Sequence, residues 1–203
     1  MYDKRTSSLW STLQGEPVVG PLVGKGIRLE RRSVVTTTWG AWKQRHPGTT
    51  VLSLQTGVDR DYGEGVAYRD YFATDRLMFQ TPFEDKRLPN KREVVALRTA
   101  EGGLPVAIDT RFLKRHPVHG IRHGDEDLVI LTNSVGESRV YRSGGFKFAK
   151  WNGGDRVTDT AGHQWIVRED ALTREDKRLE RYPSHQSFWF GWRAQFPKTK
   201  LVK

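Results

Sequence analysis

Three histidines occur at short intervals in the middle of the chain, with a spacing that metal sites use. His116, His119 and His123 follow the pattern H-x2-H-x3-H, which on one helical face would place three imidazoles together as ligands for a divalent metal ion. Carboxylates at 125–127 would be available to complete such a site. A proline and a glycine between the histidines interrupt any such helix, so the alternative is a polar loop that joins two strands.

A second candidate site lies in the segment between residues 56 and 91, where arginine, tyrosine and aspartate are interleaved. These residue types can form a pocket for an anion or a sugar, because arginine makes planar bidentate hydrogen bonds and tyrosine offers a flat stacking face. The alternative is that the acidic and basic side chains pair with one another and tie the loop down. The residues expected at the rim of the pocket are Arg60, Tyr62, Asp85, Arg87 and Lys91.

Other chemistry is excluded or unsupported for these 203 residues. The sequence contains no cysteine, which excludes disulfides, thiolate nucleophiles, cysteine-ligated zinc and iron–sulfur clusters within it. The remaining histidines have no serine or aspartate at a known catalytic spacing, so a catalytic triad is unsupported. The residues therefore assign neither an enzyme activity nor a cofactor.

Basic residues outnumber acidic ones, 34 to 24, which gives a formal net charge of +10. Part of this excess is clustered, because residues 111–124 and 193–203 contain basic side chains and no acidic ones. Such clusters can bind nucleic acid or another polyanion. No nucleic-acid motif accompanies them, so we regard polyanion binding as a weaker hypothesis than a basic but ordinary surface.

Length and composition predict a single globular domain over residues 1–203. Hydrophobic residues make up 36% of the chain and prolines number only 9, which is typical of neither disordered nor collagen-like chains. The sequence contains no run of 18 apolar residues and does not begin with the pattern of a signal peptide.

An internal repeat is the strongest signal in the chain. Residues 28–52 align without a gap on residues 178–202, at a constant offset of 150, and eight positions are identical. Two of these identities are tryptophans, and further upstream Trp10 corresponds to Trp165. We expect a partial first unit over residues 1–54 and a second unit over 127–203, joined by an irregular and hairpin-containing segment, 55–126.

Each copy of the repeat predicts a strand, a short helix and a second strand. A cluster of Thr or Ser offers helix caps, large rings recur at i, i+3 and i+7, and a proline ends the helix. A helix with one aromatic stripe is expected to pack that stripe on a sheet. We therefore predict that the rings of both copies are core positions and that the histidine among them is half-buried. The ring positions are Trp39, Trp42 and His46 in the first copy and Trp189, Trp192 and Phe196 in the second.

Between the copies, apolar runs alternate with turn signals and predict hairpins. Residues 93–98 and 104–108 flank one turn, and residues 127–132 and 138–142 flank another. We predict an α+β fold that is predominantly antiparallel β, with short tryptophan-rich helices and two related units. About two hairpins precede Trp165 but only nine residues precede Trp10, so the first unit is expected to be truncated at its N-terminal side.

The tryptophan-rich motifs resemble a bacterial family, number 3179 among the domains of unknown function, over nearly the whole chain. The resemblance implies a shared fold but no mechanism. It also implies an upstream segment with a Cys-Pro-Leu-Cys-like motif and, since export is common among the relatives, an extracytoplasmic location. The motifs that carry it are MYDKRTSSLWSTLQGEPVVGPLVG, TTWGAWKQRHPGTTVLSLQTG, DKRLPNKREVVAL and FWFGWRAQFPKTKLV.

Two functional hypotheses follow from these observations. The first is a noncatalytic ligand-binding or structural module of a bacterial extracytoplasmic protein. The alternative is a metal- or redox-dependent enzyme whose Cys-containing N-terminal segment is absent from this sequence. The two differ because only the enzyme would require that segment for its chemistry.

Overall fold

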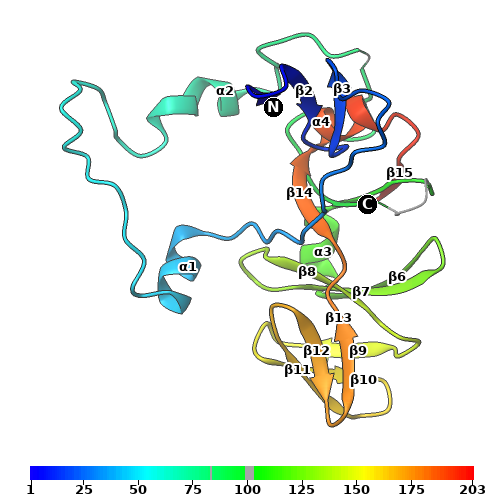
Figure 1. Ribbon diagram of the computed structural model, residues 1–203. Helices are drawn as coiled ribbons and strands as arrows, with labels where there is room; N and C mark the ends of the chain where they lie inside the picture. The colour runs from blue at the N-terminus through cyan, green and yellow to red at the C-terminus, as the bar shows by residue number, and fades with distance from the viewer. Residues whose placement is uncertain (83, 99–102) are drawn as a thin grey trace.

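The computed structural model of the protein describes residues 1–82, 84–98 and 103–203, and most of its regular structure is β (Figure 1). The helices are short: α1 (Trp39–Arg45), the 3-10 turn η1 (Val66–Tyr68), α2 (Arg69–Ala73), α3 (Thr110–Arg115) and α4 (Trp189–Gln195). The strands are β1 (Tyr2–Asp3), β2 (Ser8–Ser11), β3 (Glu16–Val19), β4 (Glu93–Leu97), β5 (Val106–Asp109), β6 (Val118–His123), β7 (Glu126–Thr132), β8 (Ser138–Arg142), β9 (Phe148–Trp151), β10 (Arg156–Asp159), β11 (Gln164–Val167), β12 (Ala171–Arg174), β13 (Lys177–Glu180), β14 (Ser184–Phe188) and β15 (Lys200–Val202).

The strands form four sheets. We call them the N-terminal sheet (β1-β2-β3), the upper sheet (β14-β4-β5-β15), the middle sheet (β6-β7-β8) and the lower sheet (β13-β12-β11-β10-β9). The named strands pair antiparallel in the described part of the chain except for β15, which runs parallel to β5. The predicted α+β class, predominantly antiparallel β with short helices, is confirmed.

The hairpins predicted from the turn signals are present. β4 pairs with β5 and β7 pairs with β8, both in antiparallel register. In each case two short apolar runs are separated by residues that favour a turn, which is the pattern that brings sequence neighbours together as a hairpin. The turn of the first hairpin includes residues 99–102, which lie outside the described residues.

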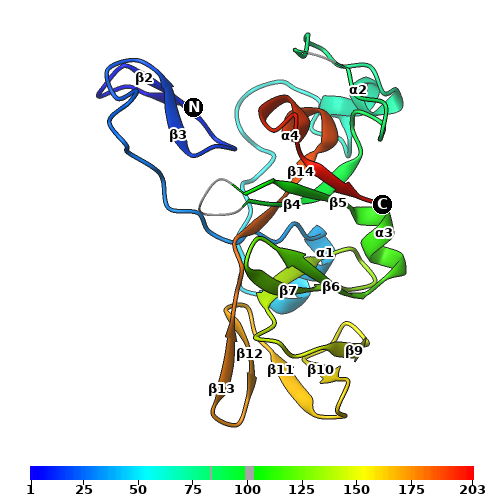
Figure 2. The same cartoon turned by 90° about the vertical axis from the view of Figure 1, so that its right-hand side faces the viewer.

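The upper, middle and lower sheets are stacked (Figures 1 and 2). The hairpin β4–β5 carries buried apolar side chains on both faces. Val95 and Ile108 pack with Ile130 in the core between the upper and middle sheets. Val94 points to the opposite face and packs with Trp189 of α4. Because side chains alternate along a strand, burial of both faces requires the nearly continuous apolar runs that these strands contain.

The middle sheet repeats this arrangement one layer down. Ile130 of β7 faces the upper sheet, whereas Val129 and Leu131 belong to a second core with Trp165 of the lower sheet. Tyr141 of β8 is fully buried in the same core, and its hydroxyl donates a hydrogen bond of 2.7 Å to the carbonyl of Arg168. The resulting order of layers is α4, upper sheet, middle sheet and lower sheet.

The segment from α1 to α2 stands away from these layers as an arm, visible at the left of Figure 1. Apart from η1 and α2, the described residues of the predicted irregular connection, 55–92, contain neither helix nor strand. Within the described part of the chain, no helix combines the length and apolar character that a membrane crossing needs.

The two copies of the repeat differ in their packing, which corrects one prediction. Trp189 and Trp192 are fully buried, as expected for core positions. In contrast, Trp39 is 50% exposed and Trp42 is 39% exposed, and His46 is also exposed, so the core prediction is wrong for the first copy. The reason is that residues 34–38 and 50–52 belong to no strand, so the helix of the first copy has no sheet of its own to cover.

Two matched substitutions test this difference. We expect Trp192→Ala to lower the free energy of unfolding by about 3–5 kcal/mol, because it leaves a large cavity against the upper sheet. Trp42→Ala at the equivalent position should lower it by about 1 kcal/mol or less, since the side chain is largely exposed. Urea unfolding followed by circular dichroism measures both values, and equal losses would contradict the packing described here.

Candidate functional site

The exposed helix α1 has the same local structure as the buried helix α4. Trp42 Nε1 donates to Thr49 Oγ1 at 2.9 Å, and Trp192 Nε1 donates to Thr199 Oγ1 at the same distance. The residue that ends each helix has nearly the same backbone angles, φ −129° and ψ 67° at His46 against φ −131° and ψ 72° at Phe196. These contacts are made within the segment itself, so they form whether or not a sheet covers the helix.

The ring contacts of the two copies also match. The rings of Trp42 and His46 lie 4.0 Å apart between centroids, and those of Trp192 and Phe196 lie 4.3 Å apart. In the second copy this aromatic pair packs on the upper sheet, with Ala96 and Ala107 in the same core. In the first copy the pair faces outward and forms part of an exposed apolar surface.

We call this surface the α1 face. It consists of the aromatic stripe of the helix and the apolar residues of the chain that follows it. Leu52 is 95% exposed, and the other members are also exposed, which is unusual for side chains of this size gathered in one short segment. Several large apolar side chains exposed in one short segment make it a candidate interaction site. Its members are Trp39, Trp42, Val51, Leu52 and Leu54.

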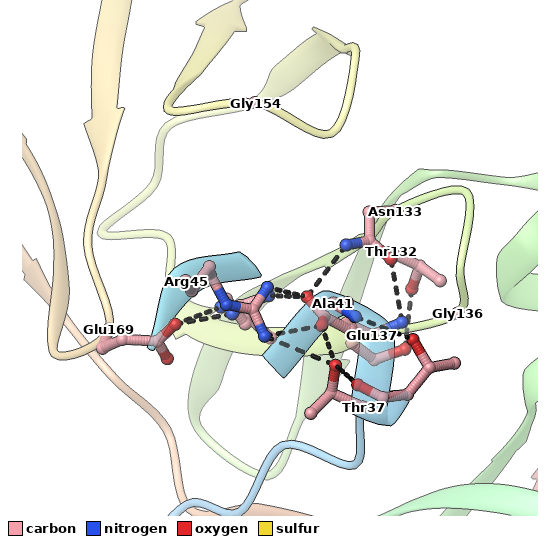
Figure 3. A network of polar contacts seen from close by, with 12 residues as sticks. Thr37, Ala41, Arg45, Thr132, Asn133, Gly136, Glu137, Gly154 and Glu169 are labelled. Atoms are coloured by element: carbon pink, nitrogen blue, oxygen red, sulfur yellow. Dashed lines mark hydrogen bonds and ion pairs between the residues drawn. The ribbon is translucent and has the colours of Figure 1, made fainter. Parts of the chain in front are cut away.

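The opposite side of α1 is fastened to the turn between β7 and β8 by a buried carboxylate (Figure 3). The side chain of Glu137 is fully buried, and Arg45 donates to both of its oxygens at 2.7 Å. The Thr37 hydroxyl donates to it as well, as do Asn133 Nδ2 at 2.9 Å and Arg139 at 3.1 Å. We call this network the Glu137 latch, because it joins the first copy of the repeat to the layered core.

The latch keeps Glu137 ionised. Burial alone would raise its pKa, but the hydrogen bonds from Arg45, Thr37 and Arg139 outweigh that effect and lower the pKa to about 2. Arg139 in turn donates to Glu169 at 2.5 Å, which balances the second guanidinium. With its oxygens accepting four groups of donors, Glu137 positions α1 and has no role as a base.

The three histidines of the proposed metal site are not brought together. His116 ends α3, and His119 and His123 lie on the extended strand β6. Four residues of a strand span about 13 Å, so even the two that share a face are too far apart to ligate one ion. The described residues contain no group of three or more His, Asp or Glu side chains that could hold a metal, and the site that the spacing predicts is therefore not formed.

Two of the predicted ligand-binding residues lie against the buried helix α4. Arg87 donates to the Asp85 carboxylate at 2.7 Å, its guanidinium lies 5.0 Å from the ring centre of Trp189, and Trp189 Nε1 donates to the Asp85 carbonyl at 3.3 Å. This pair lowers the pKa of Asp85, mainly through the hydrogen bond from Arg87. The internal pairing considered as the alternative to a pocket is thus present at these two residues.

Of the other three predicted residues, Arg60 and Tyr62 lie on the arm and Lys91 lies just before β4. Lys91 donates to the carbonyls of Tyr71 and Thr74 and lies over the Tyr71 ring, which ties α2 to the start of β4. Tyr62 is exposed, and its hydroxyl lies 2.9 Å from that of Thr56. Arg60 is exposed as well. The structure thus joins Asp85 to Arg87 but shows no hydrogen bond or ion pair, among the described residues, that links either to Arg60 or Tyr62.

Sequence reasoning missed the Glu137 latch entirely. Glu137 stands in a stretch that reads as an ordinary polar turn, and Arg45 is 92 residues away in the chain. Arg45 stands where the second copy has Gln195, but 17 of the 25 aligned positions differ, so this difference alone gives no signal.

Glu137→Gln tests the latch. Because the folded pKa is about 2 against an ordinary value of 4.5, ionised Glu137 contributes about 3 kcal/mol of stability above pH 4.5, and this is lost as the pH falls toward 2. The variant should therefore lose about 2–4 kcal/mol at pH 7 and show a weaker dependence on pH over this interval. Hydrogen exchange should also speed up in α1. Urea unfolding at several pH values measures the loss of stability and its dependence on pH.

Glu180→Gln is the matched control, because that carboxylate is exposed and pairs only with Arg178 among the described residues. It should change stability by less than about 0.5 kcal/mol. If Glu137→Gln behaves like this control at pH 7, or keeps the wild-type pH dependence, the latch does not hold α1.

Comparison with known proteins places the chain in a family. No curated protein and no solved structure matches it. A family model described as "Protein of unknown function (DUF3179)" matches residues 1–199, which is nearly the full length. The chain therefore belongs to the DUF3179 family of proteins of unknown function.

Proposed function

We propose that this chain is a noncatalytic binding module, and that the α1 face binds a β-hairpin of a protein partner. One observation carries the proposal: α1 has the C-terminal backbone geometry, the Trp–Thr hydrogen bond and the ring pair of α4, but not the sheet that α4 covers. The second copy thus supplies a template for what the first copy binds.

The template defines the geometry of the partner. Around α4, β14 pairs antiparallel with β4 and β15 pairs parallel with β5, so a single hairpin joins the strands before and after the helix. The equivalent segments of the first copy are residues 34–38 and 50–52. A hairpin between them would gain backbone hydrogen bonds on both edges, which is how extended peptides add to an open sheet.

The template also defines the chemistry of the partner. Ala96 and Ala107 are the small residues that let the tryptophans of α4 lie close to the sheet, so small side chains are expected on the face that meets α1. Residues 28–54 carry five basic side chains and one acidic one, a net charge of +4, which favours an acidic partner. The hairpin that covers α4 itself begins at Glu93 and ends at Asp109.

The second candidate is a metal- or redox-dependent enzyme whose Cys-containing N-terminal segment is absent from this sequence. Its chemistry would need cysteines, which these 203 residues do not contain. The two hypotheses differ in whether that segment is required for function.

A peptide of residues 92–110, which is the chain's own β4–β5 hairpin, is the probe for the proposal. Its addition should protect Trp42 from acrylamide quenching and slow hydrogen exchange over residues 34–52, because the peptide supplies the missing strands. Trp39→Ala combined with Trp42→Ala should weaken the binding at least about tenfold, since it removes the largest contacts.

Two controls define what would contradict the proposal. A peptide of the same composition in scrambled order should not bind. Protection from hydrogen exchange that is confined to β14 and α4 would mean that the peptide only replaces the chain's own β4–β5 hairpin. A concentration-dependent dimer that Trp42→Ala abolishes would mean that a second copy of the chain covers the α1 face. A bound metal or a reactive thiol on the natural partner would favour the enzyme.

A further inference from the structure

A surface cleft of about 670 Å³ lies beside the edge strands β6 and β9, where the middle and lower sheets are in contact. Pockets for small ligands have volumes of about 300–1,000 Å³, so the cleft is large enough to hold one. One side of the cleft is apolar and the other is polar. The polar side consists of Lys150, Asn152, Asp155, Arg156, Thr158 and Gln164.

Four of these polar side chains share one face of the lower sheet. Thr158 of β10 lies opposite Lys150 of β9 on one side and opposite Gln164 of β11 on the other. Arg156 precedes Thr158 by two residues on the same strand, so its side chain points the same way. Val157, between them, points to the other face and is buried in the core. Three neighbouring strands thus bring four polar groups together on the solvent side.

The hydrogen bonds within the cleft use the oxygens of its amide side chains and leave the donors. Asn152 Oδ1 accepts from the Gly154 amide at 3.1 Å, and Gln164 Oε1 accepts from Arg156 at 3.2 Å. Each side-chain amide therefore keeps its NH2 group for a ligand. Among the described residues, no hydrogen bond or ion pair engages the Lys150 ammonium. A cleft so rich in donors requires a ligand rich in acceptor oxygens.

The charges in the cleft favour an anion that also carries hydroxyl groups. Lys150 and Arg156 are two cations, and Asp155 is the one carboxylate among the described residues that line the cleft. No described residue pairs with the Asp155 carboxylate, which is therefore available to accept hydrogen bonds from hydroxyl groups. An inorganic anion would be repelled by this carboxylate and could give it no hydrogen bond.

The apolar side of the cleft is held in place by the core. It includes Val118 and Trp151, and the Trp151 indole donates to the Gly154 carbonyl at 2.8 Å while its ring packs against the core of the lower sheet. Gly153 has a φ of +87°, and a Cβ atom there would lie 3.2 Å from Asn133 Cβ, so this turn is pressed against the turn between β7 and β8. Groups that are fixed in advance lose little conformational entropy when a ligand binds.

We propose that this cleft binds an acidic saccharide of the uronic acid class, which is a pyranose ring that carries a carboxylate. The carboxylate binds to Lys150 and to Arg156, whose planar guanidinium matches its two oxygens. The hydroxyl groups exchange hydrogen bonds with Asp155 and Gln164. The C–H bonds of the sugar give it an apolar face, which packs on Trp151. The cleft shares no residue with the α1 face, so neither proposal depends on the other.

Calorimetric titration with trigalacturonate tests the proposal, with its full methyl ester and acetate as comparison ligands. Trigalacturonate should bind saturably, and the ester should bind at least about tenfold more weakly, because it keeps the sugar but lacks the charge. Acetate, which has the charge without the ring, should also bind at least about tenfold more weakly. Lys150→Met should weaken trigalacturonate binding at least about tenfold and leave binding of the ester unchanged. Gln164→Leu should weaken both, with an unchanged melting temperature because its side chain is exposed.

Lys147→Met is the matched control, because Lys147 is an exposed lysine three residues earlier that does not line the cleft. It removes the same charge and should leave trigalacturonate binding unchanged. Equal weakening by Lys147→Met and Lys150→Met would reduce the effect to overall charge and overturn the proposal. Equal affinity of the wild-type protein for trigalacturonate and for its ester or acetate would overturn it as well, as would the absence of saturable binding.

Discussion

The hairpin β4–β5 must be covered on both faces and at both edges, and most of the molecule is arranged to do this. The middle sheet buries one face, where Val95 and Ile108 lie, and α4 buries the other. β14 and β15 occupy the two edges. These two strands directly precede and follow α4 in the chain. A single segment of about twenty residues therefore covers one face and both edges of the hairpin.

The first copy of the repeat shows how much of that segment's structure is local. The caps, the indole to threonine hydrogen bond and the ring pair are all present in α1 without any sheet. What the sheet adds is burial, and in its absence α1 is held by polar contacts through Arg45 and Glu137. The same motif is thus stabilised by apolar contact in one copy and by a buried ion pair in the other.

Local patterns in the sequence were sufficient for the fold class, the hairpins and the position of both helices. Each of these depends on neighbours in the chain, such as the apolar runs around the turn at 133–137 or the proline that follows each helix. The exposure of Trp39 and Trp42 could not be predicted, because an aromatic stripe says which side of a helix is apolar and not whether a sheet lies against it.

The parallel pairing of β15 with β5 has a consequence for how the chain is made. Residues 200–202 are still inside the ribosome when β4, β5 and the first copy of the repeat have already emerged. The hairpin β4–β5 is therefore complete while β14, α4 and β15, which cover it in the folded protein, are still being made. One face and both edges of the hairpin lack their final partners until residues 184–202 arrive.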